Sequence, residues 1–374
     1  MEIVRVLLVD DQRELASEYK EAAEMFCDEN QLDCQLMVTQ EVDVDSAIKR
    51  LSDLNEVFDI AIIDLTLSRG ADRDTNNGNK VIEILQKHTR LPIIVATSTP
   101  GEIDSNYTQS CFLKVITKDQ FGNNNTHIIE TIFKIYNTGI TKILNKKGKI
   151  EECLNNLFWS HFSRVFESWI DCKYEQSPEE KESSLLRSVF FHINEYIDQS
   201  VKIYNPNEFY IYPPVKKYLS SGDIVSHSNF LFIVMTPACS IEPREQGQIN
   251  AEHIVFAGID LLSKFVDVSS LNSKTGSNNK NRTKLENFLK NKKQEYYFLP
   301  KFHTIEASLI NFEKIYHLST ESVNKLLENG RLVRVATISA PFIKDIIEKY
   351  SAYYSRQGAP DFDTGKLYMQ LTSH

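Results

Sequence analysis

The sequence has no long apolar run, no cysteine cluster and no excess of positive charge. No stretch approaches the roughly 18 to 20 apolar residues that a membrane helix needs, and the N-terminus lacks a signal peptide's basic and apolar regions. The six cysteines form no C-x-x-C pair, which argues against a zinc site or a disulfide framework, and lie at positions 27, 34, 111, 153, 172 and 239. We therefore expect a cytoplasmic protein with reduced thiols and no membrane contact.

Charge and missing motifs exclude further classes of protein. The 374 residues carry 42 basic and 51 acidic side chains, a formal charge of −9, so we do not expect a nucleic-acid partner. The sequence contains no P-loop, zinc motif, nucleophile elbow or cyclic-nucleotide synthase motif, and its last helices lack a helix-turn-helix pattern. With 41% hydrophobic residues, the chain can bury the cores of two domains.

Strands and helices alternate over the first 140 residues. Four apolar runs resemble strands buried in a parallel sheet, namely "VRVLLV", "FDIAIIDL", "LPIIVATS" and "CFLKVITK", and a further strand is expected at 34–40. Helices are expected from Leu15 onward and at 44–56, 79–89, 101–109 and 126–137. This alternation predicts a doubly wound α/β domain with a five-stranded parallel sheet.

Polar residues stand where these strands end. Asp10 and Asp11 follow the first strand and Asp64 follows the third, while Thr97 and Lys118 end the last two. Ligands of open parallel sheets bind beyond the carboxyl ends of the strands. Three clustered carboxylates would repel one another unless they hold a hard divalent cation, for which Mg²⁺ is well suited. A hydroxyl and an ammonium group can bind phosphoryl oxygens, and a carboxylate can act as the nucleophile.

These five positions, in this order, resemble the receiver domain of two-component response regulators, and the resemblance covers residues 1–140. It implies a flavodoxin-like fold and a phosphoryl group accepted by Asp64 in "AIIDLTL". It also implies that Thr97 in "IIVATS" is the switch hydroxyl and Lys118 in "VITKDQ" the site lysine. The implied partner is a histidine kinase or a phosphotransfer protein.

The same resemblance implies a Mg²⁺ site made by Asp10, Asp11, Asp64 and the backbone carbonyl of Thr66. The chain departs from the family in three places. Val115 replaces the usual aromatic residue, Asp119 replaces the usual proline, and a polar segment extends over 68–79. That segment contributes a partner surface, alters access of water to an acyl phosphate, or is a tolerated surface insertion.

A linker and two helices are expected over 141–203. After the basic "GITKILNKKGK", one helix is predicted at 150–171 and a second after Ser177, a plausible N-cap. These helices predict a hairpin that packs on itself or on another copy, as a homodimer through residues 150–200. His161 and His192 are candidates for an internal phosphorelay, although their flanks match no phosphotransfer motif and both fit ordinary boundary residues.

The remainder, 204–374, predicts an α+β domain with a small β-barrel or sandwich. Strands are expected in "EFYIYPP", 221–241, "EYYFLP" and "RLVRVATIS", a loop at 269–283, and helices in "KLENFLKNKKQ" and around Ile343–Tyr354. Cys239 with His227 and His253 could form a thiol nucleophile and its base, although a free cysteine is usually structural.

Two C-terminal motifs, "FIVMTPACSI" and "ISAPFIKDIIEKYSAYYSRQGAPD", are similar to an uncharacterised region of bacterial phage-defence proteins of the Detocs type. The combined expectation is a response-regulator-like phosphoacceptor whose C-terminal part is an interaction module and not an enzyme. Two alternatives stay open. One is a phosphate buffer or phosphorelay protein without its own output, and the other is an effector enzyme switched by the receiver.

Overall fold

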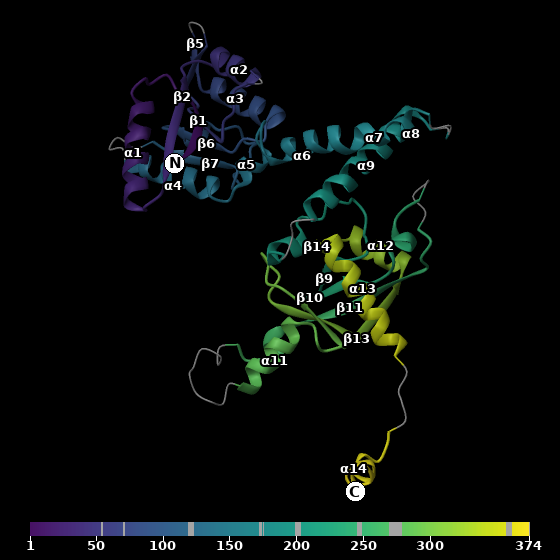
Figure 1. Cartoon of the computed structure of the whole chain (residues 1–374). Helices are drawn as coiled ribbons and strands as arrows, with labels where there is room; N and C mark the ends of the chain where they lie inside the picture. The colour runs from purple at the N-terminus through teal and green to yellow at the C-terminus, as the bar shows by residue number, and fades with distance from the viewer. Residues whose placement is uncertain are drawn as a thin grey trace. The chain divides into compact units, whose positions relative to one another are not determined.

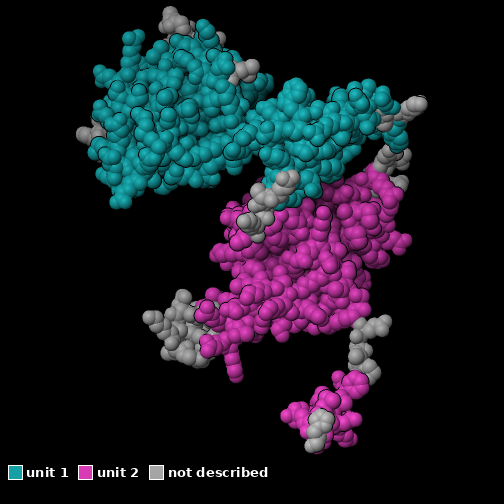
Figure 2. Space-filling model, viewed as in Figure 1, with its two compact units in different colours: residues 1–200 teal, residues 201–374 magenta. Residues whose placement is uncertain are grey.

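The chain forms two compact units, Met1–Ser200 and Val201–His374, in a computed structural model (Figures 1 and 2). The structure describes residues 1–53, 55–69, 72–118, 123–171, 174, 176–198, 203–244, 249–268, 279–356 and 361–373. Within these ranges, no helix is both long enough and apolar enough to cross a membrane.

A five-stranded parallel sheet forms the centre of the first unit. Its order is β2-β1-β3-β6-β7, with β1 at Glu2–Val9, β2 at Cys34–Glu41, β3 at Ile60–Ile63, β6 at Ile93–Thr97 and β7 at Leu113–Thr117. This is the flavodoxin-like strand order, and it confirms the predicted doubly wound α/β fold. Every residue of β3 and β6 is buried, as expected for strands covered on both faces.

Helices cover both faces of this sheet. One apolar core involves α1 (Leu15–Glu29) and α4 (Asn123–Tyr136), where Tyr19 and Phe133 are fully buried. The other involves α2 (Val44–Ser52) and α3 (Thr75–His88). Because helices fill both faces, the ends of the strands are the places where polar groups can gather.

Two local predictions in this unit are wrong. The helix expected at 101–109 is only a 3₁₀ turn at Pro100–Glu102, after which the Asp104 carboxylate accepts a hydrogen bond from the Asn106 backbone N–H at 2.9 Å. The helix expected from 79 begins earlier, at Thr75. It follows a two-stranded ladder of β4 (Leu67–Arg69) and β5 (Asp72–Asp74) within the segment predicted as a polar loop.

A helical hairpin ends the first unit. The predicted linker contains α5 (Ile140–Leu144), and the first arm consists of α6 (Lys149–Leu157), a π-helical turn (Phe158–Phe162), α7 (Ser163–Val165) and α8 (Glu167–Ile170). The second arm is α9 (Pro178–Asp198). Ser177 caps it as predicted, because its hydroxyl accepts from the Glu180 N–H at 3.2 Å while Glu180 accepts from the Ser177 N–H at 2.8 Å.

The second unit contains one seven-stranded antiparallel sheet in place of the expected small barrel or sandwich. Its order is β12-β13-β11-β10-β9-β14-β8. The strands are β8 (Tyr210–Ile211), β9 (Asp223–His227), β10 (Phe230–Val234), β11 (His253–Leu261), β12 (Tyr296–Leu299), β13 (Ser308–Ser319) and β14 (Leu332–Ile338). The central strands β11 and β13 were not predicted from the sequence.

Helices pack on both faces of this sheet. Ile346 of α13 (Ala340–Ser355) joins the core on one face, and Val323 of α12 (Thr320–Glu328) joins the core on the other. The predicted last helix is thereby confirmed, and the short α10 (Ala238–Ile241) and α14 (Thr364–Thr372) were not predicted. Of the loop expected at 269–283, residues 269–278 lie outside the described residues, and 279–283 begin α11 (Asn279–Leu289).

Candidate functional site

Three carboxylates meet at the carboxyl ends of β1 and β3. Oxygens of Asp10, Asp11 and Asp64 lie within 4.8 Å of one another. Adjacent pairing of the two strands places them together, since Val9 aligns with Ile63 immediately before the acidic positions. Asp10 and Asp64 are buried, and Asp11 is half-buried. Such a cluster is stable only where positive charge faces it.

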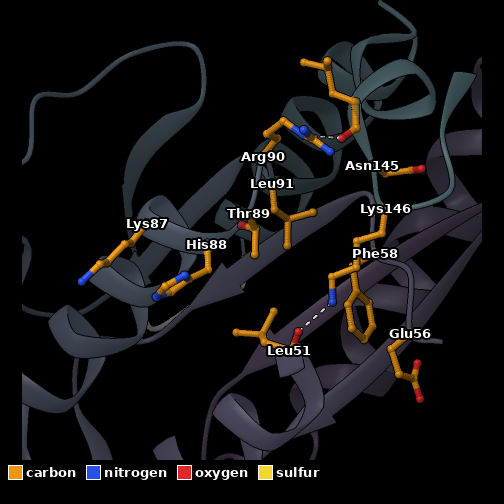
Figure 3. A pocket seen from close by; sticks show the side chains of 11 residues that line it. Leu51, Glu56, Phe58, Lys87, His88, Thr89, Arg90, Leu91, Asn145 and Lys146 are labelled. Carbon is orange, nitrogen blue, oxygen red and sulfur yellow. Dashed lines mark hydrogen bonds between the residues drawn. The ribbon is translucent and has the colours of Figure 1, made fainter. Parts of the chain in front are cut away.

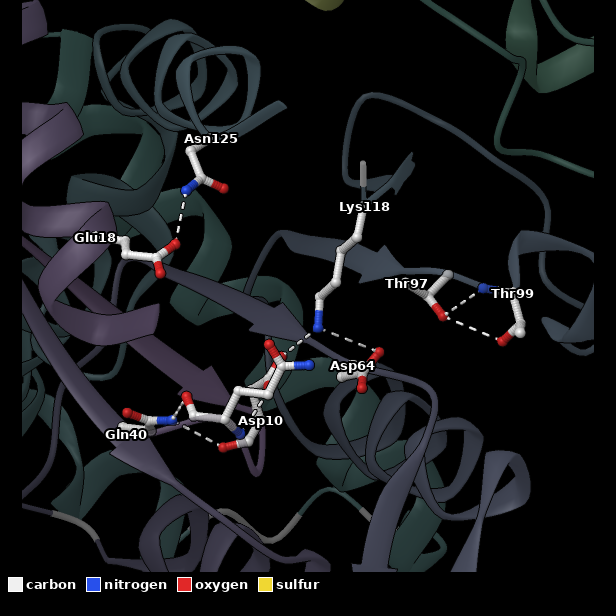
Figure 4. Close-up of polar contacts among 9 residues, drawn as sticks. Asp10, Glu18, Gln40, Asp64, Thr97, Thr99, Lys118 and Asn125 are labelled. Carbon is white, nitrogen blue, oxygen red and sulfur yellow. Dashed lines mark hydrogen bonds and ion pairs between the residues drawn. The ribbon is translucent and has the colours of Figure 1, made fainter. Parts of the chain in front are cut away.

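Lys118 supplies positive charge within the protein (Figure 4). Its Nζ lies 2.5 Å from Asp10 Oδ2 and 3.6 Å from Asp64 Oδ1, and it follows β7 at the same edge of the sheet. Burial raises the pKa of the Asp64 carboxyl above its usual range; Lys118 opposes this shift and Asp10 adds to it. Asp10 and Asp64 are therefore desolvated acids held by the Lys118 ammonium.

Neighbouring polar groups fix the orientation of Asp10. The Gln12 backbone N–H donates to Asp10 Oδ1 at 2.9 Å. The Gln40 side-chain amide donates to the backbone carbonyls of Asp10 at 2.9 Å and Gln12 at 2.8 Å. Sequence reasoning missed Gln40, yet its place near the end of the predicted second strand is the same signal that identified the other site residues.

Thr97 is fully buried at the end of β6, beside β3. Its hydroxyl accepts from the Thr99 backbone N–H at 3.2 Å and lies 3.3 Å from the Thr99 hydroxyl (Figure 4). Among the hydrogen bonds of the described residues, none joins Thr97 to Asp64. The structure thus brings the predicted hydroxyl to the same edge of the sheet with its oxygen directed to Thr99. Val115 is half-buried on β7, and Asp119 lies outside the described residues.

The segment after Asp64 is held against the first turns of α3. The Gly78 N–H donates to the Leu65 carbonyl at 3.0 Å, and the buried Asn77 side chain donates to the Leu67 carbonyl at 3.0 Å. A Cβ on Gly78 would lie 2.4 Å from the Asp64 carbonyl oxygen, so only glycine permits this approach. Neither residue was predicted to matter.

The donor set fits a hard divalent cation. Three carboxylates offer closely spaced anionic oxygens, and the backbone carbonyl of Thr66 belongs to the segment that follows Asp64. Oxygen-only ligand sets favour Mg²⁺, Ca²⁺ or Mn²⁺ over zinc, which prefers nitrogen and sulfur. The acidic triad could therefore hold a metal ion.

The structure does not bring Cys239 and its candidate bases together. Cys239 is exposed, and its Sγ lies 3.8 Å from the Ser240 hydroxyl. His227 Nδ1 lies 2.9 Å from the Arg331 carbonyl, and the His253 ring faces His317. In the described part of the chain, no hydrogen bond links the thiol to either imidazole.

The two histidines of the hairpin differ in their surroundings. His161 is exposed, whereas His192 is half-buried, with its ring 4.6 Å from that of Phe162 and its Nδ1 2.7 Å from the Ser188 carbonyl. These contacts give His192 a packing role between the two arms of the hairpin.

A separate cavity of about 330 Å³ lies before the start of β3 and β6, at the amino ends of the strands (Figure 3). Phe58 and Leu91 line it. Lys146 donates to the Leu51 carbonyl at 2.7 Å, and Arg90 donates to the Leu144 carbonyl at 2.8 Å. The basic groups here tie the chain after α5 to the α/β domain, and the cavity lies at the opposite end of the sheet from Asp64.

No family model and no curated protein matches the sequence. A CheY-like receiver domain from Methylobacillus flagellatus is 14% identical, with a TM-score of 0.26, over 35% of this chain and 99% of that chain. The Mn²⁺-bound response regulator Rcp1 is 18% identical, with a TM-score of 0.27, over 36% of this chain and 94% of that chain. RcsB of Salmonella typhimurium is 16% identical, with a TM-score of 0.26, over 53% of this chain and 100% of that chain. Identities this low do not assign the chain to a family.

Proposed function

We propose that this chain is a response-regulator-like phosphoacceptor, which takes a phosphoryl group from the phosphohistidine of a histidine kinase or phosphotransfer protein onto Asp64. The observation that carries the proposal is the position of the Asp64 carboxylate, which is buried at a strand end beside the Lys118 ammonium that it shares with a second acid, Asp10. A desolvated carboxylate with a cation 3.6 Å away is suited to attack an anionic group without repelling it.

In the proposed step, an Asp64 oxygen forms a bond to phosphorus while the bond from phosphorus to the histidine nitrogen breaks. The electron pair of that bond stays on the histidine ring, which leaves as neutral imidazole because its other ring nitrogen carries a proton. Lys118 donates to the phosphoryl oxygens as their charge shifts, and Thr97 turns its hydroxyl from Thr99 toward the same group.

Asp10, Asp11, Asp64 and the carbonyl of Thr66 would hold Mg²⁺ in this proposal. When bound, the ion neutralises charge on the phosphoryl oxygens. With Asp10 among the metal's ligands, the Lys118 ammonium would be available to the phosphoryl group. The hydrogen bonds from Gln12 and Gln40 would keep Asp10 in place.

The proposal places the chain in bacterial signal transduction and assigns no reaction to the second unit. A role in phage defence rests only on the two C-terminal motifs that resemble Detocs-type proteins, and therefore stays a hypothesis. Detection of the protein's phosphorylated form during phage infection, and its absence in uninfected cells, would support that role. An unchanged phosphorylation level would contradict it.

The test is intact-mass spectrometry of the full chain after incubation with phosphoramidate, which has a phosphorus–nitrogen bond, with and without Mg²⁺. Wild type should gain one phosphoryl group in Mg²⁺ only, and Asp64→Asn should gain none. Asp59→Asn is the matched control, since Asp59 is also a buried carboxyl next to β3 but lies before the start of that strand, where it accepts from the Arg5 N–H at 2.9 Å. Equal uptake by wild type and Asp64→Asn would refute the proposal.

A further inference from the structure

The hairpin of α6 to α9 carries an apolar surface that its own unit leaves open. None of the 21 residues of α9, all of them described, is buried, although the helix has an apolar stripe. Five large side chains of the hairpin are 45 to 72% exposed: Trp159, Phe166, Ile170, Leu186 and Phe190. We call these five residues the apolar patch. Solvent-exposed apolar clusters of this size mark interaction surfaces in soluble proteins.

The seam between the two arms sets the orientation of the patch. The Phe162 ring lies 4.6 Å from the His192 ring, so the arms contact each other there and run antiparallel (Figure 1). Phe162 and His192 therefore serve as the seam residues of the first arm and of α9.

The patch residues share one side of the hairpin. Successive helical residues rotate by about 100°, so Phe166 and Ile170 follow the first seam residue by about 40° and 80°. Leu186 and Phe190 lie about 120° and 160° from the seam residue of α9 in the same sense. Because the arms are antiparallel, rotations in the same sense away from the seam bring both sets to the same side.

We propose that the apolar patch binds a second copy of this chain, so that two hairpins form a four-helix bundle. Two helices alone cannot enclose an apolar face, whereas four can. A two-fold axis lets the same patch serve both partners and requires no other protein. The five side chains expose roughly 600 Å², and a standard interface buries about 800 Å² per partner. The patch thus supplies most of the apolar area that a stable dimer needs.

The first test measures the molar mass of the full chain by light scattering across a concentration series. Wild type should have the mass of two chains. Phe190→Asp should shift the dissociation constant upward by at least about 100-fold, as loss of a buried aromatic anchor does. Phe230→Asp is the matched control, because Phe230 is 62% exposed in the second unit and Phe190 is 60% exposed. The control should remain a dimer.

Intrinsic fluorescence gives an independent readout, since both tryptophans of the chain, Trp159 and Trp169, lie in the hairpin. Emission of wild type should shift to longer wavelength on dilution, in step with dissociation, and Phe190→Asp should show the shifted spectrum throughout. Circular dichroism verifies that the Phe190→Asp variant is folded, and Leu186→Asp is used in its place if it is not.

A single-chain mass of wild type at high micromolar concentration would overturn the proposal. A dimer that survives these substitutions would also overturn it. Tryptophan emission that moves to shorter wavelength only when a different protein is added would overturn it as well. The proposal does not depend on phosphoryl transfer.

Discussion

Replacement of Gly78 by alanine should destabilise the first unit, which is the reverse of the usual effect in a helix. Gly78 lies in the first turn of α3. A Cβ at this position would lie 2.4 Å from the Asp64 carbonyl oxygen and 2.4 Å from the Leu65 Cα. Both are backbone atoms, so no side-chain rotation can relieve the overlap.

The magnitude follows from two opposing effects. A glycine-to-alanine change inside a helix normally stabilises it by about 1 kcal/mol. Overpacking against rigid neighbours costs about 1–3 kcal/mol, and contacts this far inside van der Waals distance call for the upper end of that range. We expect a net loss of about 1–2 kcal/mol, together with slower phosphoryl uptake, because the segment that carries Asp64 has to move.

Hydrogen exchange of peptides that span β3 measures this loss locally in the full chain. Exchange should be faster by roughly 5–30-fold in Gly78→Ala, the factor that corresponds to the expected free energy. Gly101→Ala is the control, since a Cβ at Gly101 meets no atom within 4 Å. Unchanged or slower exchange of β3 in Gly78→Ala would refute the close approach on which this reasoning depends.

Three further predictions concern stability. Phe312→Ala should lower the free energy of unfolding of the second unit by about 3–5 kcal/mol in urea titrations, because the ring is fully buried against Tyr350; an effect below 1 kcal/mol would contradict that packing. Burial opposes ionisation of Asp260, but hydrogen bonds from Lys314 and Asn311 outweigh it and lower the pKa of this carboxyl. Its stabilisation is therefore present above the unfolded pKa of about 3.9 and is lost on acidification. The difference in the free energy of unfolding between wild type and Asp260→Asn should accordingly become smaller as the pH falls. A difference that grows would contradict the lowered pKa of Asp260. Ser177→Ala should destabilise α9 by about 1 kcal/mol, because the helix loses its N-cap. Hydrogen exchange in the first turn of α9 should then be faster than in wild type, and equal exchange would contradict the capping role.

The first unit was predictable because its signals are local. Each strand of the parallel sheet is a short apolar run, and each site residue directly follows such a run, so one rule about strand ends placed Asp10, Asp64, Thr97 and Lys118 together. The helix expected at 101–109 failed because Asp104 binds the backbone of Asn106 and Tyr107 donates to the Asn79 carbonyl at 3.1 Å. Contacts of that kind compete with helix formation and leave little trace in apolar spacing.

The second unit was less predictable because its sheet depends on pairing between distant segments. β11 pairs with both β10 and β13, and its register with β13 shifts between Ala257 and Gly258. A shift of this kind breaks the alternation of apolar and polar residues by which an exposed strand is recognised. Gly78 was missed for a similar reason, since its role is defined by an atom of Asp64, fourteen positions away, and not by its own neighbours.

The most direct test of the account is to locate the phosphoryl group on the chain. After uptake from phosphoramidate in Mg²⁺, borohydride reduction converts an aspartyl phosphate to homoserine, which tandem mass spectrometry can place in the sequence. The account predicts homoserine at position 64 of wild type and at no position of Asp64→Asn. A phosphoryl group that resists reduction and maps to His161 or His192, or homoserine at another aspartate, would contradict it.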